Sequence, residues 1–445
     1  MKFEKWTLGL AAVGAVSLAS AARAEEKLTA LQTALSSTTI SGYVDTSAQW
    51  NLGTGNSSVA PVKFQGPGKA DGFNLNVVQL TISKPLDESD WAAGYRADLW
   101  FGPDANTLNT HSIFASGGRA SAGDLAVRQA YVALRTPIGN GIEWKFGVFD
   151  SIIGYESVES GNNPNYTRSY GHTIEPQTHT GVLGTYRFNE ILSVAAGVAN
   201  TIGPAINERA HGPNAAIDPD APVDAESYKA YMGSIALTAP ESWGWAAGST
   251  LYGGVVNGFS SGVIDNVTSW YVGATLATPV TGLKLGAAFD YLDAHNFPSN
   301  ADSVWALALY ASYQATEKLS LHLRGEHLDG ETPSDDVNLY ALTATVQYDL
   351  WKNVISRLEF RWDHADNPSF ARRPFGGRTG SGSVGGGSDI PDYFETSSSS
   401  AFEDYHSDSV LIEDLISGVG GSLPAPGDRA RKNAYMLALN IIYKF

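Results

Sequence analysis

NAYMLALNIIYKF, residues 433–445, shows the alternation that decides the fold. One face is apolar throughout and has an aromatic residue at each end; it carries Tyr435, Leu437, Leu439, Ile441, Tyr443 and Phe445. The other face is mostly small or polar; it carries Ala434, Met436, Ala438, Asn440, Ile442 and Lys444. An apolar face bounded by aromatic residues is typical of a strand that spans a membrane as part of a β-barrel.

Five further segments alternate in the same way, and their second face is charged. Charges repeated on one face of strand after strand indicate that this face meets water while the other meets lipid. We therefore predict a set of lumen-lining side chains: Arg96, Asp98, Lys145, Lys284, Asp290, Arg324, Glu326, Arg357, Glu359 and Arg361. The segments 73–85 and 245–255 do not allow their faces to be assigned.

The whole sequence predicts sixteen strands, at 40–51, 73–85, 90–102, 124–136, 141–150, 178–188, 190–201, 227–238, 244–257, 267–278, 282–293, 303–315, 318–328, 337–350, 353–364 and 433–445. Connections after even-numbered strands are short, and most of those after odd-numbered strands are long and rich in Gly, Asn, Ser and Pro. This parity predicts an all-β fold, a closed antiparallel transmembrane barrel with short periplasmic turns and long external loops.

Residues 1–24 have the pattern of a cleaved secretory signal peptide, with two early lysines, an apolar run at 6–22 and small residues at Ala22 and Ala24. Its removal would change the formal charge from −17 to −19, because three basic residues and one acidic residue are lost. We expect export to the bacterial outer membrane, with outer-membrane lipid as the surrounding partner. The acidic balance and the exported address argue against nucleic acid as a partner.

Two segments are expected to stand apart from the strands. Residues 25–37 predict a short periplasmic segment, too short for a stable isolated helix. Residues 38–445 then form the barrel. Within it, 365–432 is predicted to be a long, low-complexity external loop, with a Gly/Ser run at 376–388.

The segment after the fifth strand carries a resemblance to a known family. Its residues are Phe149-Asp150, Gly154-Tyr155-Glu156, Asn163-Pro164-Asn165-Tyr166-Thr167-Arg168-Ser169-Tyr170 and Thr178-His179-Thr180-Gly181-Val182. Together with Ile40-Ser41-Gly42-Tyr43-Val44-Asp45 and Asn440-Ile441-Ile442-Tyr443-Lys444-Phe445, this resembles the β-barrel porin-2 group, the OmpL-like porins of Gram-negative outer membranes. The long 365–432 loop departs from the group's pattern.

The resemblance implies a passive channel for small hydrophilic solutes, narrowed by an inward-folded loop after the fifth strand. The candidate constriction residues on that loop are Glu156, Glu159, Asn165, Tyr166 and Arg168. The alternative is a structural or adhesion barrel with a plugged lumen and partner-binding external loops. A homotrimer is kept open as the assembly, and Tyr443 with Phe445 resembles the signal that barrel-assembly machinery recognises.

The lumen charges suggest one electrostatic hypothesis. Arg324, Arg357 and Arg361 on the wall, opposed by Glu156 and Glu159 on the loop, would create a field across the channel. Alternatively, Glu326, Glu359 and Asp363 neutralise these arginines as pairs. No hydrolase or metalloprotease motif is present, and no catalytic, cofactor or metal site is predicted. Acidic residues at 218–226 are interpreted as a solvated loop.

Overall fold

The computed structural model describes residues 37–53, 62–65, 67–108, 110, 124–210, 226–259, 267–293, 303–332, 335–366 and 432–445. Within these ranges the chain forms sixteen strands: β1 (Thr39–Asn51), β2 (Gly72–Lys84), β3 (Ala92–Phe101), β4 (Leu125–Thr136), β5 (Ile142–Asp150), β6 (Thr178–Arg187), β7 (Leu192–Ala199), β8 (Ala230–Thr238), β9 (Thr250–Gly258), β10 (Val267–Ala277), β11 (Leu283–Asp293), β12 (Ser303–Gln314), β13 (Leu319–Thr332), β14 (Asp335–Trp351), β15 (Val354–Ala365) and β16 (Asn433–Lys444).

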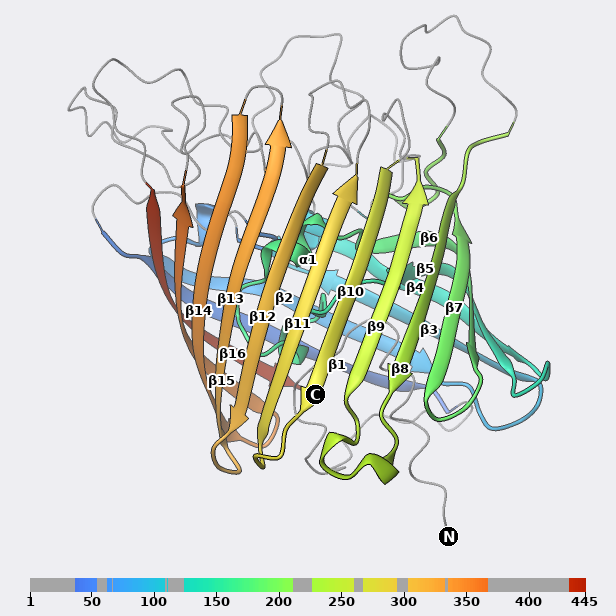
Figure 1. The fold of residues 1–445 in the computed structure, drawn as a ribbon. Coiled ribbons are helices and arrows are strands. Elements are labelled where there is room, and N and C mark those ends of the chain that lie inside the picture. The colour runs from blue at the N-terminus through green and yellow to red at the C-terminus, as the bar shows by residue number, and fades with distance from the viewer. Residues whose placement is uncertain are drawn as a thin grey trace, which may run out of the picture.

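Each strand pairs antiparallel with its neighbours in sequence, and β1 pairs with β16, so the sheet closes on itself (Figure 1). Closure leaves no unpaired edge strand. The predicted closed antiparallel barrel of sixteen strands is therefore confirmed. Among the described residues, no helix combines the length and the apolar character needed to cross a membrane.

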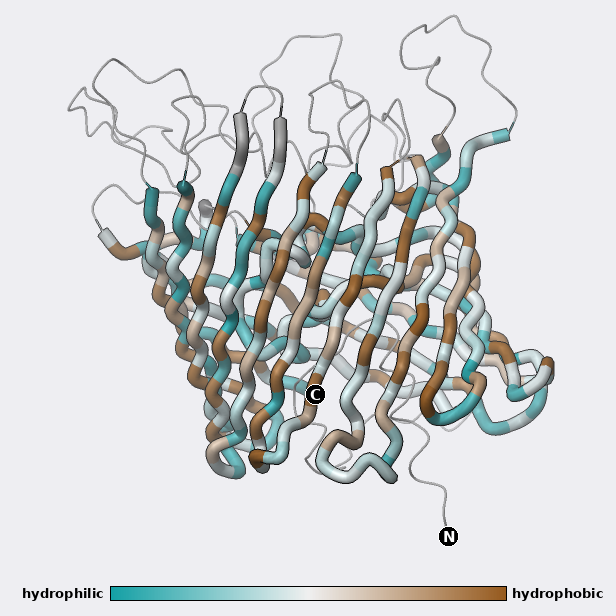
Figure 2. Tube along the Cα trace, viewed as in Figure 1, coloured by the Kyte–Doolittle hydropathy of each residue, from teal (hydrophilic) through white to brown (hydrophobic). Residues whose placement is uncertain are grey.

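The alternation read from 433–445 is present in space. Tyr435, Leu439 and Ile441 are exposed on the outside of β16, whereas Ala438 and Ile442 are fully buried inside. Figure 2 shows the same alternation of apolar and polar positions along the front strands. A barrel whose outside is apolar suits a lipid surrounding.

Two register shifts explain what alternation alone did not resolve. The β1–β2 pairing shifts at Asp45/Thr46, where Asn76 is the extra residue of β2. Phe73 therefore lies on the outer face, 90% exposed, while Gln79 beyond the shift is buried inside. A second shift between β3 and β4 leaves Arg128 without a partner in the register and turns it into the interior. Bulges of this kind reverse the faces of a strand partway along it.

The strand predicted at 244–257 begins too early. Residues Glu241–Ala246 form a short 3-10 helix, η5, and β9 starts only at Thr250. Trp243 and Trp245 alternate like girdle residues but are 60% and 62% exposed on this turn. Gly244 and Gly248 have φ values of 62° and 79°, which a regular strand does not adopt. The turn between β8 and β9 is consequently longer than predicted.

The segment 151–177, between β5 and β6, folds into the barrel; we call it the inner loop. It contains the 3-10 helix η4 (Ser160–Asn162) and the single-turn helix α1 (Tyr170–Ile174), which Figure 1 shows behind the front strands. Ser169 caps α1 by accepting the N–H of His172. The predicted segment 1–24, residues 25–36 of the predicted segment 25–37 and most of 365–432 lie outside the described residues.

Candidate functional site

The inner loop is fixed to opposite parts of the barrel wall by two carboxylates. Glu159 accepts hydrogen bonds from Gln79 on β2 at 3.1 Å, Arg96 on β3 at 3.0 Å and Arg128 on β4 at 2.8 Å. Glu156 accepts from Arg324 on β13 at 2.8 Å and from Tyr310 on β12 at 3.2 Å. A segment that touches β2–β4 and also β12–β13 must cross the interior.

A second set of anchors lies on β14 and β15. The Glu359 carboxylate accepts the backbone N–H groups of Tyr166 and Thr167 at 2.6 and 2.9 Å. It also accepts the hydroxyls of Thr167 and Thr345, both at 2.7 Å. Arg357 donates to the backbone carbonyls of Ser160 and Asn163 at 3.1 and 2.6 Å. Backbone groups of the loop that lack partners in a regular helix or strand are thereby satisfied.

The two remaining wall arginines combine carboxylate partners with loop carbonyls. Arg324 bonds Glu326 at 2.7 Å and the carbonyl of Thr167 at 2.7 Å. Arg361 bonds Asp363 at 2.7 Å and the carbonyl of Arg168 at 2.9 Å. The side chains of both arginines are 0% exposed. Buried guanidinium groups are stable only when they are paired in this way.

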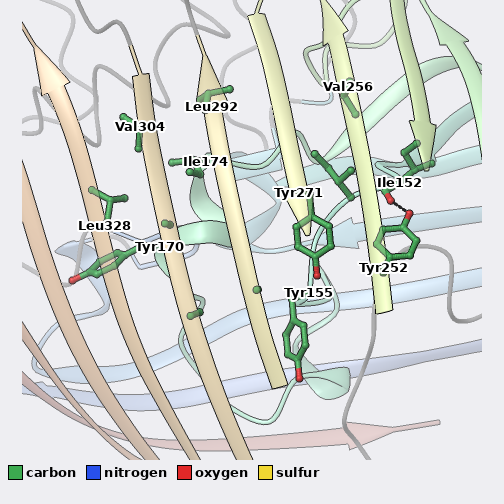
Figure 3. Packing of buried hydrophobic residues seen from close by; sticks show 14 of the residues in the cluster. Ile152, Tyr155, Tyr170, Ile174, Tyr252, Val256, Tyr271, Leu292, Val304 and Leu328 are labelled. Carbon is green, nitrogen blue, oxygen red and sulfur yellow. Dashed lines mark hydrogen bonds between the residues drawn. The ribbon is translucent and has the colours of Figure 1, made fainter. Parts of the chain in front are cut away.

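Apolar contacts complete the seat of the loop. Tyr155 stacks on Tyr310 with ring centroids 4.2 Å apart. Gly286 on β11 leaves the space that the Tyr155 hydroxyl occupies, since a Cβ atom there would collide with it. On β9, Tyr252 donates to the carbonyl of Ile152, as Figure 3 shows. The loop therefore packs against aromatic side chains of β9 and β12 and against the space at Gly286, in addition to its bonds with charged side chains.

Two titratable groups of the loop are held neutral. Burial, and after it the negative charge of Asp290, raises the pKa of Glu175 well above its usual range. Burial, and after it the positive charge of Arg168, lowers the pKa of His172 well below its usual range. The His172 ring and the Glu175 carboxyl lie 3.6 Å apart. That distance is too long for a hydrogen bond. Because both groups are neutral, they do not form an ion pair either.

The ten predicted lumen-lining side chains fall into two groups. Arg96, Lys145 and Lys284 are half-buried on the inner face of the barrel. The other seven are buried: Asp98, Asp290, Arg324, Glu326, Arg357, Glu359 and Arg361. Of the predicted loop residues, Asn165, Tyr166, Arg168 and Glu156 are buried and Glu159 is half-buried.

These positions bear on the hypothesis of a field across the channel. Glu156 touches Arg324 directly, so these two charges do not face each other across open space. Glu326 and Asp363 neutralise the arginines, as the alternative proposed, while Glu359 bonds the loop instead. The arginines thus serve to hold the loop.

Arg128 is an anchor that the sequence analysis missed. It bonds Asp98 at 2.7 Å, Glu159 at 2.8 Å and both oxygens of Asp150. The signal was available, because an arginine amid the apolar residues of 125–134 is too costly to face lipid. Its position at the register shift hid it from strict alternation.

Metal ligation finds no support in the part of the chain that the structure describes. No group of three or more His, Asp or Glu side chains there is placed to hold an ion. The acidic stretch at 218–224 lies outside the described residues.

A family profile described as "Putative beta-barrel porin-2, OmpL-like" matches residues 37–387. The chain belongs to this family. No curated protein matches the sequence. Among solved structures, the OmpL-like chain is similar to Salmonella typhi OmpF in complex with daunomycin, at 14% identity and a TM-score of 0.53 over 92% of this chain and 97% of that one.

It is also similar to an anion-selective porin from Comamonas acidovorans, at 11% identity and a TM-score of 0.52 over 92% of this chain and 99% of that one. At these identities the two likenesses concern the fold. Together with the family, they support a porin-type barrel of the outer membrane and a general porin role for this OmpL-like protein.

Proposed function

We propose that this OmpL-like barrel lets small hydrophilic solutes and ions diffuse passively through a water-filled lumen that the inner loop narrows. No chemical step takes place. The barrel sits in outer-membrane lipid after export and removal of residues 1–24, and a homotrimer is the proposed assembly. Tyr443 and Phe445 are proposed to guide barrel-assembly machinery.

One observation carries the proposal: the inner loop bonds to opposite walls through Glu156 and Glu159. A crossing segment fixed at both ends sets the free cross-section of a tube, because it cannot swing aside. Half-buried charged side chains such as Lys145 and Lys284 favour water in the space that it leaves open.

The second candidate is a structural barrel with a plugged lumen. It is favoured by the burial of the inner loop, in which only Glu159, Asn162 and Pro176 are not fully buried. Single-channel conductance separates the two. Stepwise current from the purified protein in a planar bilayer supports the channel, whereas a folded protein that gives none supports the plug.

Shortening the inner loop tests its role directly. Removing residues 157–169 leaves both strand ends in place but deletes the Glu159 anchor and the contacts to β15. We expect larger single-channel conductance and faster liposome swelling with disaccharides. The matched control is a deletion of the same kind in the turn helix Glu241–Ala246, which should leave both values unchanged. A folded loop variant with normal conductance would show that the constriction lies elsewhere.

A further inference from the structure

The interior-facing charges of the strands separate by sign according to whether water reaches them. Of the charged side chains on described strand residues that face the interior, the half-buried ones are mostly basic: Arg96, Arg135, Lys145, Arg187, Lys284 and Lys444 against Glu143, Asp150 and Asp349. Their orientation follows from the register. Lys145, for example, lies opposite Leu183, and Arg187 lies opposite Ser193.

The fully buried interior charges have the opposite balance. Four arginines, at 128, 324, 357 and 361, are outnumbered by Asp45, Asp98, Asp290, Glu326, Glu359 and Asp363. These acids are engaged in contacts inside the protein. Asp45, for instance, accepts hydrogen bonds from the side-chain amides of Asn76 and Asn440. Glu326 forms ion pairs with Arg324 and Arg361. Charges consumed in such contacts and shielded from water act weakly on a passing solute.

Four of the six half-buried basic side chains lie toward the end of the barrel that carries the short turns: Arg135, Arg187, Lys284 and Lys444. Arg135 and Glu143 flank the turn between β4 and β5, and Arg187 ends β6. Lys284 is the second residue of β11 and Lys444 is the last of β16. Lys444 also donates to the carbonyl of Gly161, which places it below the inner loop.

We infer that the water-accessible lumen on this turn side is basic and selects small anionic solutes, such as chloride and organic carboxylates. The inference rests on the proposed channel function and names its substrate class. It runs against the formal charge of the whole chain, which is −17. The sign of the charge on the water-accessible lumen wall therefore differs from the sign of the net charge of the whole chain.

Screening by salt decides whether the charges on the lumen wall or the acidic residues elsewhere in the chain govern ion permeation. Acidic turn residues such as Asp87 and Glu88 are exposed to bulk solvent. At physiological salt their field decays over about 8 Å, whereas wall charges lie within that distance of an ion in the lumen. The exposed wall charges therefore dominate the field that a permeating ion meets.

The test is the reversal potential in a KCl gradient across a planar bilayer. We expect the wild-type channel to favour chloride. The triple variant K145Q/R187Q/K284Q should lower the chloride-to-potassium permeability ratio by about twofold or more. None of the three side chains has a hydrogen bond to the inner loop among the contacts of the described residues, and heat-modifiable migration verifies folding. Each single variant should produce a smaller shift in the same direction.

Two controls are matched to these substitutions. The double variant E143Q/D349N removes exposed acids from the same wall and should raise the ratio. Lys318→Gln removes one positive charge from the turn between β12 and β13 and should leave it unchanged. A wild-type channel that favours potassium, or a triple variant that conducts with an unshifted reversal potential, overturns the inference. A folded protein without any current instead overturns the proposed function on which it rests.

Discussion

Glu359 shows how much of the inner loop depends on single side chains. Its two carboxylate oxygens accept four hydrogen bonds, two of them from consecutive backbone N–H groups of the loop. An ionised carboxylate is an acceptor only, so it suits a site surrounded by donors. The residue is fully buried, and water cannot replace it.

Glu359→Gln should therefore loosen the loop without changing the volume of the side chain. An amide turns one acceptor into a donor and leaves buried N–H groups facing it unsatisfied. We expect a loss of about 2–4 kcal/mol in the free energy of unfolding in lipid vesicles. Open-channel current noise should rise with it. Glu190→Gln, on an exposed turn, is the control that should change neither value; a Glu359 variant as stable as this control would contradict the role assigned to Glu359.

At this scale the sequence predicted which residues face inward but not which of them meet water. The placement of Arg324 inside the barrel follows from alternation with Leu323 and from the cost of a charge in lipid. Its complete burial follows from contacts with Glu156 and Thr167, 168 and 157 positions away in the chain. No local pattern encodes contacts at such separation, so the assignment of Arg324 to a solvated wall could not be checked from sequence.

The inner loop is the element whose stability should depend most clearly on pH. Glu175 has a raised pKa, so the seated loop holds its proton more tightly than a released loop, whose carboxyl titrates near 4.5. Its contribution is lost as the pH rises above that value. His172 has a lowered pKa, so its contribution is lost as the pH falls below 6.5. Between 4.5 and 6.5 the two effects offset each other, and above 6.5 only the loss from Glu175 remains.

We therefore expect the loop to be seated most firmly at mildly acidic pH and to loosen progressively as the pH rises above about 6.5. Hydrogen exchange of the backbone amides in Tyr170–Ile174, converted to opening free energies, measures this. Asp290, Glu156 and Lys63 also act on Glu175, and their charges contribute to the slope. Glu175→Gln should abolish the change above pH 6.5. If this variant keeps the wild-type dependence of the opening free energy on pH, another titratable group is responsible for that dependence.

Strands were predictable as elements because alternation is a local property. Thirteen of the sixteen predicted strands agree with the observed bounds to within two residues at each end. The strand β8 starts three residues later than predicted, β13 ends four residues later, and β9 starts six residues later. In the sequence, Trp243 and Trp245 alternate like the aromatic girdle residues of a strand. In the structure, Gly244 and Gly248 have positive φ values, and the chain turns there. The fold of the inner loop was not derivable from a pattern, because its short helices are set by anchors on the distant wall. Only the family resemblance indicated that it lies inside.

The closure of the whole barrel depends on its terminal residue. Phe445 exchanges two backbone hydrogen bonds of 2.9 Å with Gly42, next to the β1–β16 pairing. Gly42 has no side chain, and a Cβ atom there would collide with the backbone carbonyl of Gln79 and with the Phe445 ring. The first and last strands are thus joined by this pair as well as by the ladder.

Deleting Phe445 should destabilise the closed barrel by about 2–4 kcal/mol, from two lost hydrogen bonds and the lost contact of the ring. The fraction of heat-modifiable protein in outer membranes should fall in parallel. Phe445→Ala keeps the backbone bonds and should fall between the deletion and the wild type. Phe188→Ala, an exposed aromatic residue on a turn, is the control. Equal folded fractions for the deletion and the control would remove Phe445 from the assembly step.

The anchors of the inner loop also impose an order in time. Its hydrogen bonds to β12–β16 join residues that are 154 to 283 positions apart. Such contacts can form only after the late strands have been made and the sheet has come round to meet them. We therefore expect the loop to dock late in folding, so that the narrow passage is the last part of the molecule to be completed. Gentle denaturation should reverse this sequence and widen the passage while the wall still stands.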